Sequence, residues 1–352
     1  MQNDHAYFNS LGPYETNPVV AVGVSGGIDS LALTFMLNTW LKSINGKLVA
    51  ITVNHNLRPE AAHEAKQIGE LLRSHDIEHH TLNWQHGKVT SNIQEQAREA
   101  RLALLTEYCR EHNILHLMLA HHAGDVAETM LIKVCRGSGL NGLTGIQPIN
   151  IINKTRVLRP LLSCSKAQLK KELAKYHNWW LEDPSNLNSE FMRSLARKVL
   201  CSNNLLQLVN VQTKKHQTLI SRFGLLSKNL SRTRHYLETQ IAHHMVQIVK
   251  IYPQGFLTIE YQQFIILDSE IGLSILANCL ITISTTHAKR PRLDSLERVL
   301  QAIIAGKSKG LTLWDCKIKL SPGRNLIEIT AERAKHTAFL PRTPLIQSIT
   351  QE

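Results

Sequence analysis

The sequence predicts an α/β fold: a doubly wound, mainly parallel sheet, followed by a helical connector and a small α+β domain. Two observations predict it. In the first half of the chain, short runs rich in β-branched residues alternate with longer segments whose apolar residues recur at helical spacing. From about residue 212 this alternation gives way to one long polar helix and then to a mixture of helices and strands. Alternating strands and helices form parallel sheets with right-handed crossovers.

The first half supplies four strands and four helices in alternation. The strands are predicted at residues 17–24, 47–54, 79–84 and 115–121, and the helices at residues 30–42, 60–75, 93–112 and 125–135. Ligands of such sheets bind beyond the carboxyl ends of the strands, where loops lead into helices. We therefore expect the functional residues after the first, second and fourth strands.

The remainder of the chain completes this domain and adds a second one. A helix at residues 165–178, an extended piece at 179–183, a turn at 184–188 and a helix at 189–201 belong to the first domain, which we place at residues 1–211. The second domain, residues 212–352, opens with the long polar helix at 212–251. It continues with a strand at 257–267, helices at 269–283 and 293–305, and a hairpin formed by 311–320 and 325–329.

The chain of 352 residues is basic, with 40 Lys and Arg against 28 Asp and Glu and a formal charge of +12. Such an excess favours a polyanionic partner such as nucleic acid. A basic surface that serves only solubility explains the excess equally well. Charge alone therefore does not decide between the two.

Six cysteines are spread along the chain without any C-x-x-C pair, so no zinc or iron–sulfur framework is predicted. Their sparse use fits reduced thiols in a reducing compartment. The N-terminal segment lacks the features of a signal peptide, and the apolar stretches are too short or too interrupted to cross a bilayer. We therefore expect a cytoplasmic protein with no membrane partner.

The strongest single signal lies between the first strand and the first helix, where the chain reads Ser25-Gly26-Gly27-Ile28-Asp29-Ser30. Adjacent glycines allow the backbone to approach an anion closely. N–H groups at the start of the helix and the serine hydroxyls can donate to its oxygens. The loop lacks the Gly-Lys-Ser/Thr ending of the Walker loop. It predicts a phosphate cradle of another kind, in which Asp29 helps to hold Mg²⁺ beside the phosphates.

This loop resembles the S-G-G-x-D-S pyrophosphate loop of the N-type ATP pyrophosphatases, which cleave ATP between its α- and β-phosphates and share the adenine nucleotide alpha hydrolase-like fold. After the second strand, Val53-Asn54-His55-Asn56-Leu57-Arg58 resembles the V-D-H-x-L-R motif of one branch, the tRNA(Ile)-lysidine synthases, with Asn54 in place of the aspartate. The resemblance implies that the six loop residues bind ATP together with His55 and Arg58. A surface histidine and a solvated arginine are the competing interpretation.

The segment from Ala120 to Thr129 resembles the A-H-H-x-D-D-Q-A-E-T motif of the same branch, and Arg136 opens the R-G-S-G stretch that follows it. Asp125 and Glu128 are three residues apart and project from one helical face. The resemblance implies that they bind the ammonium group of a lysine substrate, with Arg136 as the partner of its carboxylate. It makes Asp29, Asp125 and Glu128 the catalytic candidates. The chain departs from the motif at Gly124 and Val126, where polar side chains are lost.

Five basic residues are candidates for binding tRNA. Arg193 and Arg197 follow a D-P-S-N turn, in a stretch that resembles the F-x-R-x-x-x-R helix of the family. Four residues apart, they form a basic stripe suited to backbone phosphates, although an intramolecular ion pair explains Arg197 equally well. Lys289, Arg290 and Arg292 give the second domain a basic edge with the same predicted role.

The resemblance implies a ligase that uses ATP and Mg²⁺ to adenylate the wobble cytidine of isoleucine tRNA with a CAU anticodon, and then joins free L-lysine to C2 of that base. Two alternatives remain open. A tRNA thiolase of the same superfamily would activate a base likewise but deliver sulfur. A non-catalytic tRNA-binding relative is suggested by the losses at Gly124 and Val126. The sequence also leaves a homodimer open.

Overall fold

The computed structural model describes residues 5–56, 60–87, 93–181, 192–201, 219–284, 290–307 and 310–332. The chain divides into two compact units, and the division between Ser231 and Arg232 falls within helix α10 (Leu219–Ile248). The domain boundary predicted at residue 211 lies outside the described residues and stays a prediction. In none of the described segments is a helix long and apolar enough to span a bilayer.

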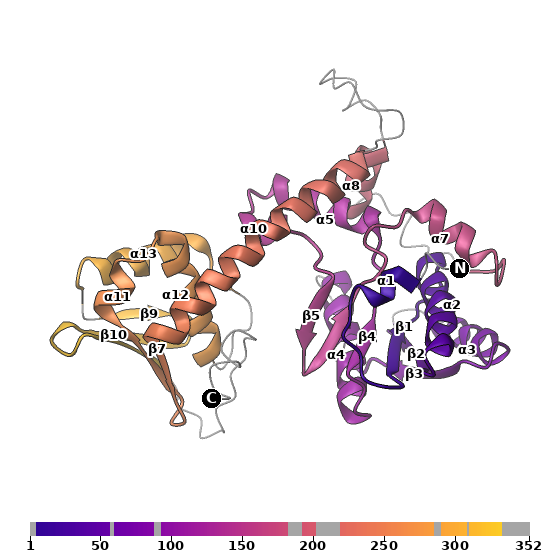
Figure 1. The fold of residues 1–352 in the computed structure, drawn as a ribbon, viewed down its shortest axis with the longest axis horizontal. Coiled ribbons are helices and arrows are strands. Elements are labelled where there is room, and N and C mark those ends of the chain that lie inside the picture. Colours follow the sequence, from indigo (N-terminus) through magenta and orange to yellow (C-terminus); the bar gives the residue numbers. More distant parts are fainter. Residues whose placement is uncertain are drawn as a thin grey trace, which may run out of the picture. The chain divides into compact units, whose positions relative to one another are not determined.

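A sheet of six strands forms the centre of the first unit (Figure 1). In chain order its strands are β1 (Val19–Gly23), β2 (Lys47–Asn54), β3 (Glu78–Asn83), β4 (His116–Met118), β5 (Ile149–Ile152) and β6 (Thr155–Leu158). Across the sheet the order is β3-β2-β1-β4-β6-β5, and all neighbours are parallel except β5 and β6. The chain runs outward from β1 to β3 and then returns to place β4 on the other side of β1. The carboxyl ends of β1 and β4 therefore form the topological switch point, where ligands bind in this class of sheet.

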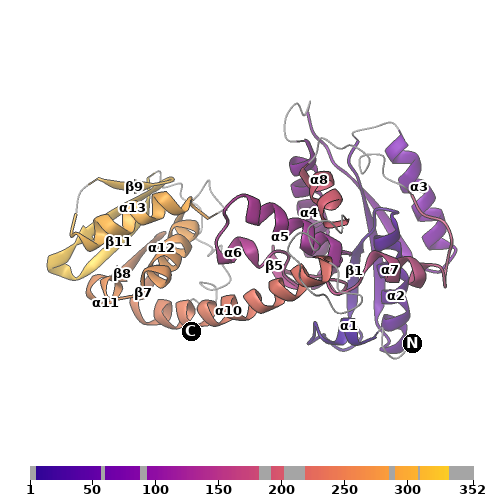
Figure 2. The same ribbon diagram turned by 90° about the horizontal axis from the view of Figure 1, so that it is seen from above.

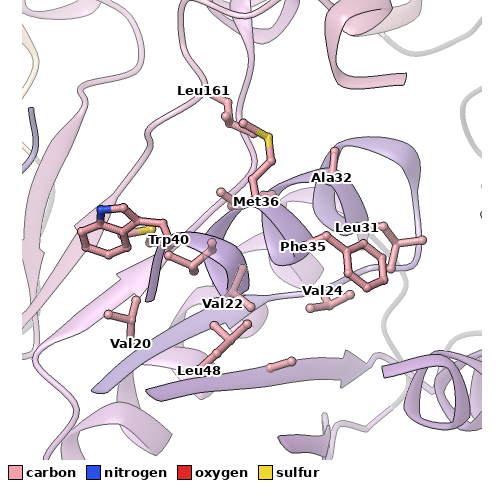
Figure 3. Close-up of a cluster of buried hydrophobic side chains, with 14 of the residues drawn as sticks. Val20, Val22, Val24, Leu31, Ala32, Phe35, Met36, Trp40, Leu48 and Leu161 are labelled. Atoms are coloured by element: carbon pink, nitrogen blue, oxygen red, sulfur yellow. The ribbon is translucent and has the colours of Figure 1, made fainter. Parts of the chain in front are cut away.

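Helices cover both faces of this sheet. They are α2 (Ile28–Ser43), α3 (Glu60–Arg73), α4 (Ile93–Glu111) and α7 (Lys166–Leu173). Side chains of α2, α3 and α7 pack with alternate strand residues in one core, whereas α4 packs on the opposite face. Figure 3 shows part of the first core, in which Phe35, Met36 and Trp40 of α2 lie over Val20 and Val22 of β1. A strand buried on both faces requires a continuous apolar run, and the sequence of β1 provides it.

The predicted doubly wound parallel sheet is confirmed, but the hairpin of β5 and β6 was not part of that prediction. Its turn is formed by Asn153 and Lys154, with φ values of 49° and 65°. Two positive φ values are the geometry that tight hairpins favour, usually with glycine at the second position. Because lysine stands there instead, the sequence carries only a weak signal for this turn.

The second unit is built on an antiparallel sheet of five strands in the order β7-β8-β11-β10-β9. After α10 its elements are β7 (Val249–Tyr252), β8 (Phe256–Glu260), α11 (Tyr261–Ile265), α12 (Ser269–Ile283), α13 (Leu293–Ile304), β9 (Leu311–Leu313), β10 (Cys316–Ser321) and β11 (Leu326–Ala331). Helices α12 and α13 pack together against this sheet around a hydrophobic core of their own (Figure 2). The predicted small α+β domain is thereby confirmed.

Three predictions of element bounds in this unit are wrong. The single strand expected at residues 311–320 is two strands, β9 and β10, which pair with each other antiparallel. The strand expected at residues 257–267 ends at Glu260, and helix α11 follows directly. The long helix expected to reach residue 251 ends at Ile248, where β7 begins. Short runs that mix apolar and polar residues fit a strand or a buried helical turn equally well, so the sequence did not show where these two elements end.

The cysteines differ in exposure. Of those whose side chains the structure describes, Cys109, Cys164, Cys279 and Cys316 are buried, and Cys135 is exposed. Burial raises the pKa of the Cys109 and Cys316 thiols to about 12. These buried thiols therefore stay protonated and behave as small apolar side chains.

Candidate active site

The loop after β1 is held closed by Ser30, in the first turn of α2. The Ser30 Oγ accepts hydrogen bonds from the backbone N–H (3.1 Å) and the hydroxyl (3.2 Å) of Ser25, and it donates to the carbonyl of Gly27 (3.0 Å). Gly27 is the N-cap of α2 and is extended. The loop therefore delivers the N-terminus of α2, the end of a helix that binds anions, to the switch point of the sheet.

Gly26 brings a second segment of the chain to this loop. Its φ of +78° lies in the left-handed region, and a Cβ atom there would lie 2.6 Å from Leu181 Cδ1 and 2.9 Å from Ile68 Cδ1. The carbonyl of Gly26 accepts the N–H of Leu181 at 2.9 Å. A residue larger than glycine cannot take this position without movement of its neighbours. The chain is thereby anchored just ahead of the D-P-S-N turn, which lies outside the described residues.

Asp29 lies in the first turn of α2 and faces the loop after β4. Its Oδ1 atom is buried and has no hydrogen-bond partner among the residues that the structure describes. Burial raises the pKa of this carboxyl above its usual range, and nearby Asp125 raises it further. The basic side chains of His122, Lys166 and Arg197 oppose that shift. A buried carboxylate oxygen without a donor suits a hard cation, so the position fits the Mg²⁺ that the resemblance implies.

His122 connects the loops that follow β1 and β4. It is the N-cap of α5 (Ala123–Cys135): its Nδ1 accepts the N–H of Gly124 at 2.9 Å, and Asp125 Oδ2 accepts the N–H of His122 at 2.9 Å. Because Nδ1 is the acceptor, the proton of the neutral ring is on Nε2. That atom lies 3.6 Å from Asp29 Oδ2. One imidazole therefore lies between the two carboxylates of the site.

Glu128, one helical turn beyond Asp125, is paired with Arg197. Helix α8 (Met192–Cys201) packs against α5, and Arg197 donates through Nε (2.7 Å) and Nη2 (3.3 Å) to the two carboxylate oxygens of Glu128. Glu128 is only 4% exposed, whereas Arg197 is exposed. For Arg197 the structure shows the intramolecular ion pair that was the alternative in the sequence, and its contact with tRNA phosphates stays a prediction.

Asn54 ties the ends of β2 and β3 together. Its Nδ2 donates to Asn83 Oδ1 at 3.2 Å, and its Oδ1 accepts the N–H of Asn56 at 3.0 Å. His55 follows, with its ring edge-on to Trp84 at a centroid distance of 6.0 Å. Both side-chain atoms of the Asn54 amide are therefore engaged at the position where the resembled motif has an aspartate.

The other residues predicted to bind ATP and lysine are not brought to the switch point by described contacts. Arg58 lies outside the described residues. Arg136 is the C-cap of α5, at the opposite end of the helix from Asp125. The two residues are eleven positions apart, which corresponds to a rise of about 16 Å along the helix axis. A lysine molecule that contacts both must therefore be extended along α5.

The basic residues predicted to bind tRNA lie in both units. The side chain of Arg193 and the whole of Lys289 are outside the described residues. Arg292 is exposed at the N-cap of α13. Arg290 is exposed overall, but its guanidinium is engaged, because Nη2 donates to Ser274 Oγ at 3.1 Å. Arg292 is therefore the better placed of these two for a phosphate.

Sequence reasoning missed three residues that shape the site. His122 is part of the Ala120–Thr129 motif, but nothing in the sequence indicated that its ring lies near Asp29. The positive charge of Lys166, the first residue of α7, acts to lower the pKa of Asp29. The chain just before Lys166 is held at the site because the carbonyl of Cys164 accepts the N–H of Ala123 at 3.0 Å. Leu181 contacts the loop through its backbone and its side chain. For Lys166 and Leu181 the sequence offered no signal.

With this geometry in view, comparison with known proteins identifies the class. The family model described as the PP-loop domain matches residues 2–204. The chain is therefore a PP-loop protein. A tRNA(Ile)-lysidine synthase of Orientia tsutsugamushi (strain Boryong) is 36% identical over 312 residues, which are 88% of this chain and 69% of that protein. Another, of Wolbachia pipientis wMel, is 33% identical over 334 residues, 93% of this chain and 72% of that protein. The chain belongs to the tRNA(Ile)-lysidine synthase family, as its motifs predicted.

A solved structure shares the fold. The U34-tRNA thiolase NcsA of Methanococcus maripaludis aligns with a TM-score of 0.52 over 65% of this chain and 78% of that chain. The two sequences are 20% identical. At that identity the likeness shows a common fold and nothing about the reaction.

Proposed function

We propose that the chain adenylates the wobble cytidine of isoleucine tRNA with a CAU anticodon and joins free L-lysine to C2 of that base, forming lysidine. One observation carries the proposal: the loop after β1 and its Asp29 face His122 and Asp125 across the switch point. A phosphate cradle beside a pair of carboxylates suits a reaction that consumes ATP and accepts an amine. The membership of the chain in the tRNA(Ile)-lysidine synthase family supports this reading.

In the first step, the C2 oxygen of the cytidine attacks the α-phosphate of ATP and pyrophosphate leaves. The residues from Ser25 to Ser30 cradle the phosphates, and the N-terminus of α2 donates N–H groups to them. Asp29 would hold Mg²⁺, which supplies positive charge to neutralise the phosphates. We propose that His55 and Arg58 contact the nucleotide, as the family resemblance implies.

In the second step, the side-chain amine of lysine attacks C2 and AMP leaves. The amine starts with a pKa of about 10.4, so the site has to take up a proton before the attack. Asp125 contacts the ammonium group, and Arg136 pairs with the lysine carboxylate. Both oxygens of Glu128 accept from the Arg197 guanidinium, which compensates the charge of this carboxylate. Glu128 would therefore have to exchange Arg197 for the lysine ammonium to take the second binding role that the resemblance implies.

Binding of tRNA relies on basic residues in both units. The proposed contacts are Arg193, Arg197, Lys289, Arg290 and Arg292. A formal charge of +12 supports a polyanionic substrate. The reaction requires the wobble base to leave its stack, and single-stranded anticodon loops permit that at low cost in free energy. A tRNA substrate is consistent with the expected cytoplasmic location.

The test is mass spectrometry of nucleosides from CAU-anticodon isoleucine tRNA incubated with the protein, ATP, Mg²⁺ and lysine. We expect a lysine adduct on one cytidine, accompanied by AMP and pyrophosphate. The adduct should disappear with Asp29→Asn, which removes the charge of the carboxylate and preserves its size. Asp76→Asn is the matched control, because Asp76 precedes β3 at the amino edge of the sheet, away from the switch point.

Two other outcomes would contradict the proposed reaction, and a third would contradict the role of Asp29. Incorporation of sulfur would identify a thiolase. Tight binding of tRNA without any modification would indicate a relative that only binds. An adduct that forms equally well with Asp29→Asn would remove Asp29 from the reaction while leaving the ligase intact.

A further inference from the structure

The ring of His122 lies over the backbone of Gly124. A Cβ atom at position 124 would lie 2.6 Å from His122 Cε1 and 3.0 Å from its Nδ1. Real Cβ atoms do not approach other atoms so closely, because repulsion rises steeply inside van der Waals contact. The imidazole can therefore occupy its observed position only when residue 124 has no side chain.

Glycine is otherwise an unfavourable choice at this position. Residue 124 is in the first turn of α5, where glycine costs conformational entropy and an acidic side chain would be favoured by the helix dipole. Its φ is not positive, so its backbone is outside the left-handed region that would require glycine. Neither helix propensity nor backbone conformation explains the glycine. The remaining explanation is steric: without a side chain at position 124, the His122 ring has space.

The observed ring position links three groups of the site. Nδ1 accepts the N–H of Gly124, so the ring is held at one nitrogen. Nε2 then lies 3.6 Å from Asp29 Oδ2, and the backbone N–H of the same histidine donates to Asp125. If the ring turned away to avoid a Cβ at position 124, the helix cap and the approach to Asp29 would both be lost.

We propose that Gly124 and His122 act as a pair, in which the glycine makes room for the imidazole and His122 is a positioning residue that holds the Asp29 carboxylate in place for the nucleotide. The inference rests on the proposed function and concerns the same site. Gly124 then has a role of its own, because the Cβ of an aspartate at this position would exclude the ring position that brings His122 to Asp29. Gly124→Asp, which restores the residue of the resembled motif, should therefore lower ATP affinity and the rate of lysidine formation.

A double-mutant cycle tests the pairing. Gly124→Ala, His122→Ala and the double variant are compared with the wild type by calorimetric titration of ATP in the presence and absence of Mg²⁺, and by the rate of lysidine formation. We expect Gly124→Ala to lower the rate at saturating ATP about tenfold, as small displacements of catalytic groups do. In the His122→Ala background the same methyl group should have no further effect. Gly224→Ala is the control, because a Cβ at that helical position meets no atom within 4 Å.

His122→Asn separates positioning from helix capping. Asparagine is a favourable N-cap residue, so helix α5 should keep its start and the melting temperature should stay near that of the wild type. Its side chain is shorter than that of histidine and does not reach Asp29. We therefore expect His122→Asn to lose rate and Mg²⁺-dependent ATP affinity as His122→Ala does, without loss of stability.

Two results would overturn the proposal. Additive effects of the two alanine substitutions would show that Gly124 does not act through His122. Wild-type rate and ATP affinity in His122→Asn would reduce the role of His122 to capping. If the wild-type protein forms no lysidine, the proposed function fails, but the ATP titrations still decide whether Gly124 and His122 are coupled.

Discussion

Gly26 is the residue at which the loop after β1 tolerates least change. Its positive φ and its contacts with Leu181 and Ile68 leave no space for a methyl group. We expect Gly26→Ala to lower the free energy of unfolding by about 1–3 kcal/mol, because strain and overpacking act together. Affinity for ATP should fall at least tenfold. Chemical denaturation and calorimetric titration measure the two effects.

The open helical position of Gly224 provides the comparison for this prediction. There the same methyl group should leave ATP binding unchanged and should stabilise the helix slightly, because alanine has the higher helix propensity. Wild-type ATP affinity in Gly26→Ala would show that the loop can shift without loss of its cradle.

At the scale of single residues, the sequence revealed the groups of the site but not their contacts. Ser25 to Ser30 could be placed at the end of the first strand because two adjacent glycines between a strand and a helix form a local pattern. The direction of the His122 ring could not be predicted. It depends on Asp29, which is 93 positions away in the sequence and becomes a neighbour only because β4 pairs with β1.

At the scale of elements, the contact between α5 and α8 includes one charged pair, whose carboxylate is buried. We expect Arg197→Gln to destabilise the protein by about 1–3 kcal/mol, because the buried carboxylate of Glu128 would lose both of its donors. The double variant with Glu128→Gln should recover part of this loss, since it removes the unpaired charge. Denaturant unfolding of the four proteins measures the coupling.

Lys198→Gln is the matched control, because Lys198 is an exposed neighbour on the same helix and should change stability by no more than about 0.5 kcal/mol. Equal stability of Arg197→Gln and the wild type would mean that the pair adds nothing to packing. Arg197 would then be available for tRNA alone.

Strand β3 carries a histidine that makes stability depend on pH. His79 Nε2 lies 2.9 Å from Thr52 Oγ1, and burial lowers the pKa of this imidazole to about 4, with smaller contributions from His80 and Arg73. In the unfolded chain the pKa is about 6.5, so the unfolded state binds the proton first as pH falls. Stability should therefore decrease between about pH 6.5 and pH 4. Because the ring is partly exposed, we expect a loss of about 1–2 kcal/mol.

His79→Gln should remove this part of the pH dependence while retaining a hydrogen bond to Thr52. Urea denaturation at several pH values, with His112→Gln as an exposed control, provides the measurement. An unchanged pH profile in His79→Gln would assign the acid sensitivity to other groups.

The elements themselves were predictable to different degrees. Parallel strands buried on both faces, such as β1, give short apolar runs that the sequence displays directly. Helix α11 and strand β7 were missed because their short runs of mixed apolar and polar residues fit either conformation, and tertiary packing decides between them. The β5–β6 hairpin was missed because its turn lacks glycine.

At the scale of the whole molecule, the two units have separate hydrophobic cores. We expect two thermal transitions in calorimetry. A saturating concentration of ATP and Mg²⁺ should raise the midpoint temperature of one of them, because ligand stabilises only the unit that binds it. At a hundredfold excess over the dissociation constant, this stabilisation is about 2.7 kcal/mol. The other transition should stay in place. A single transition that moves as a whole would show that the units unfold together.

Helix α5 begins with the capped turn of His122 and Asp125 and ends with Cys135, beside Arg136. Thiol reagents react with exposed thiolates, and the other cysteines with described side chains are buried. Among the cysteines whose side chains are described, Cys135 should therefore be the first to take up a maleimide fluorophore, without any engineered residue. Arrival of ligands along this helix would then be visible as a change in emission, so the wild-type chain already carries an attachment point for an optical reporter.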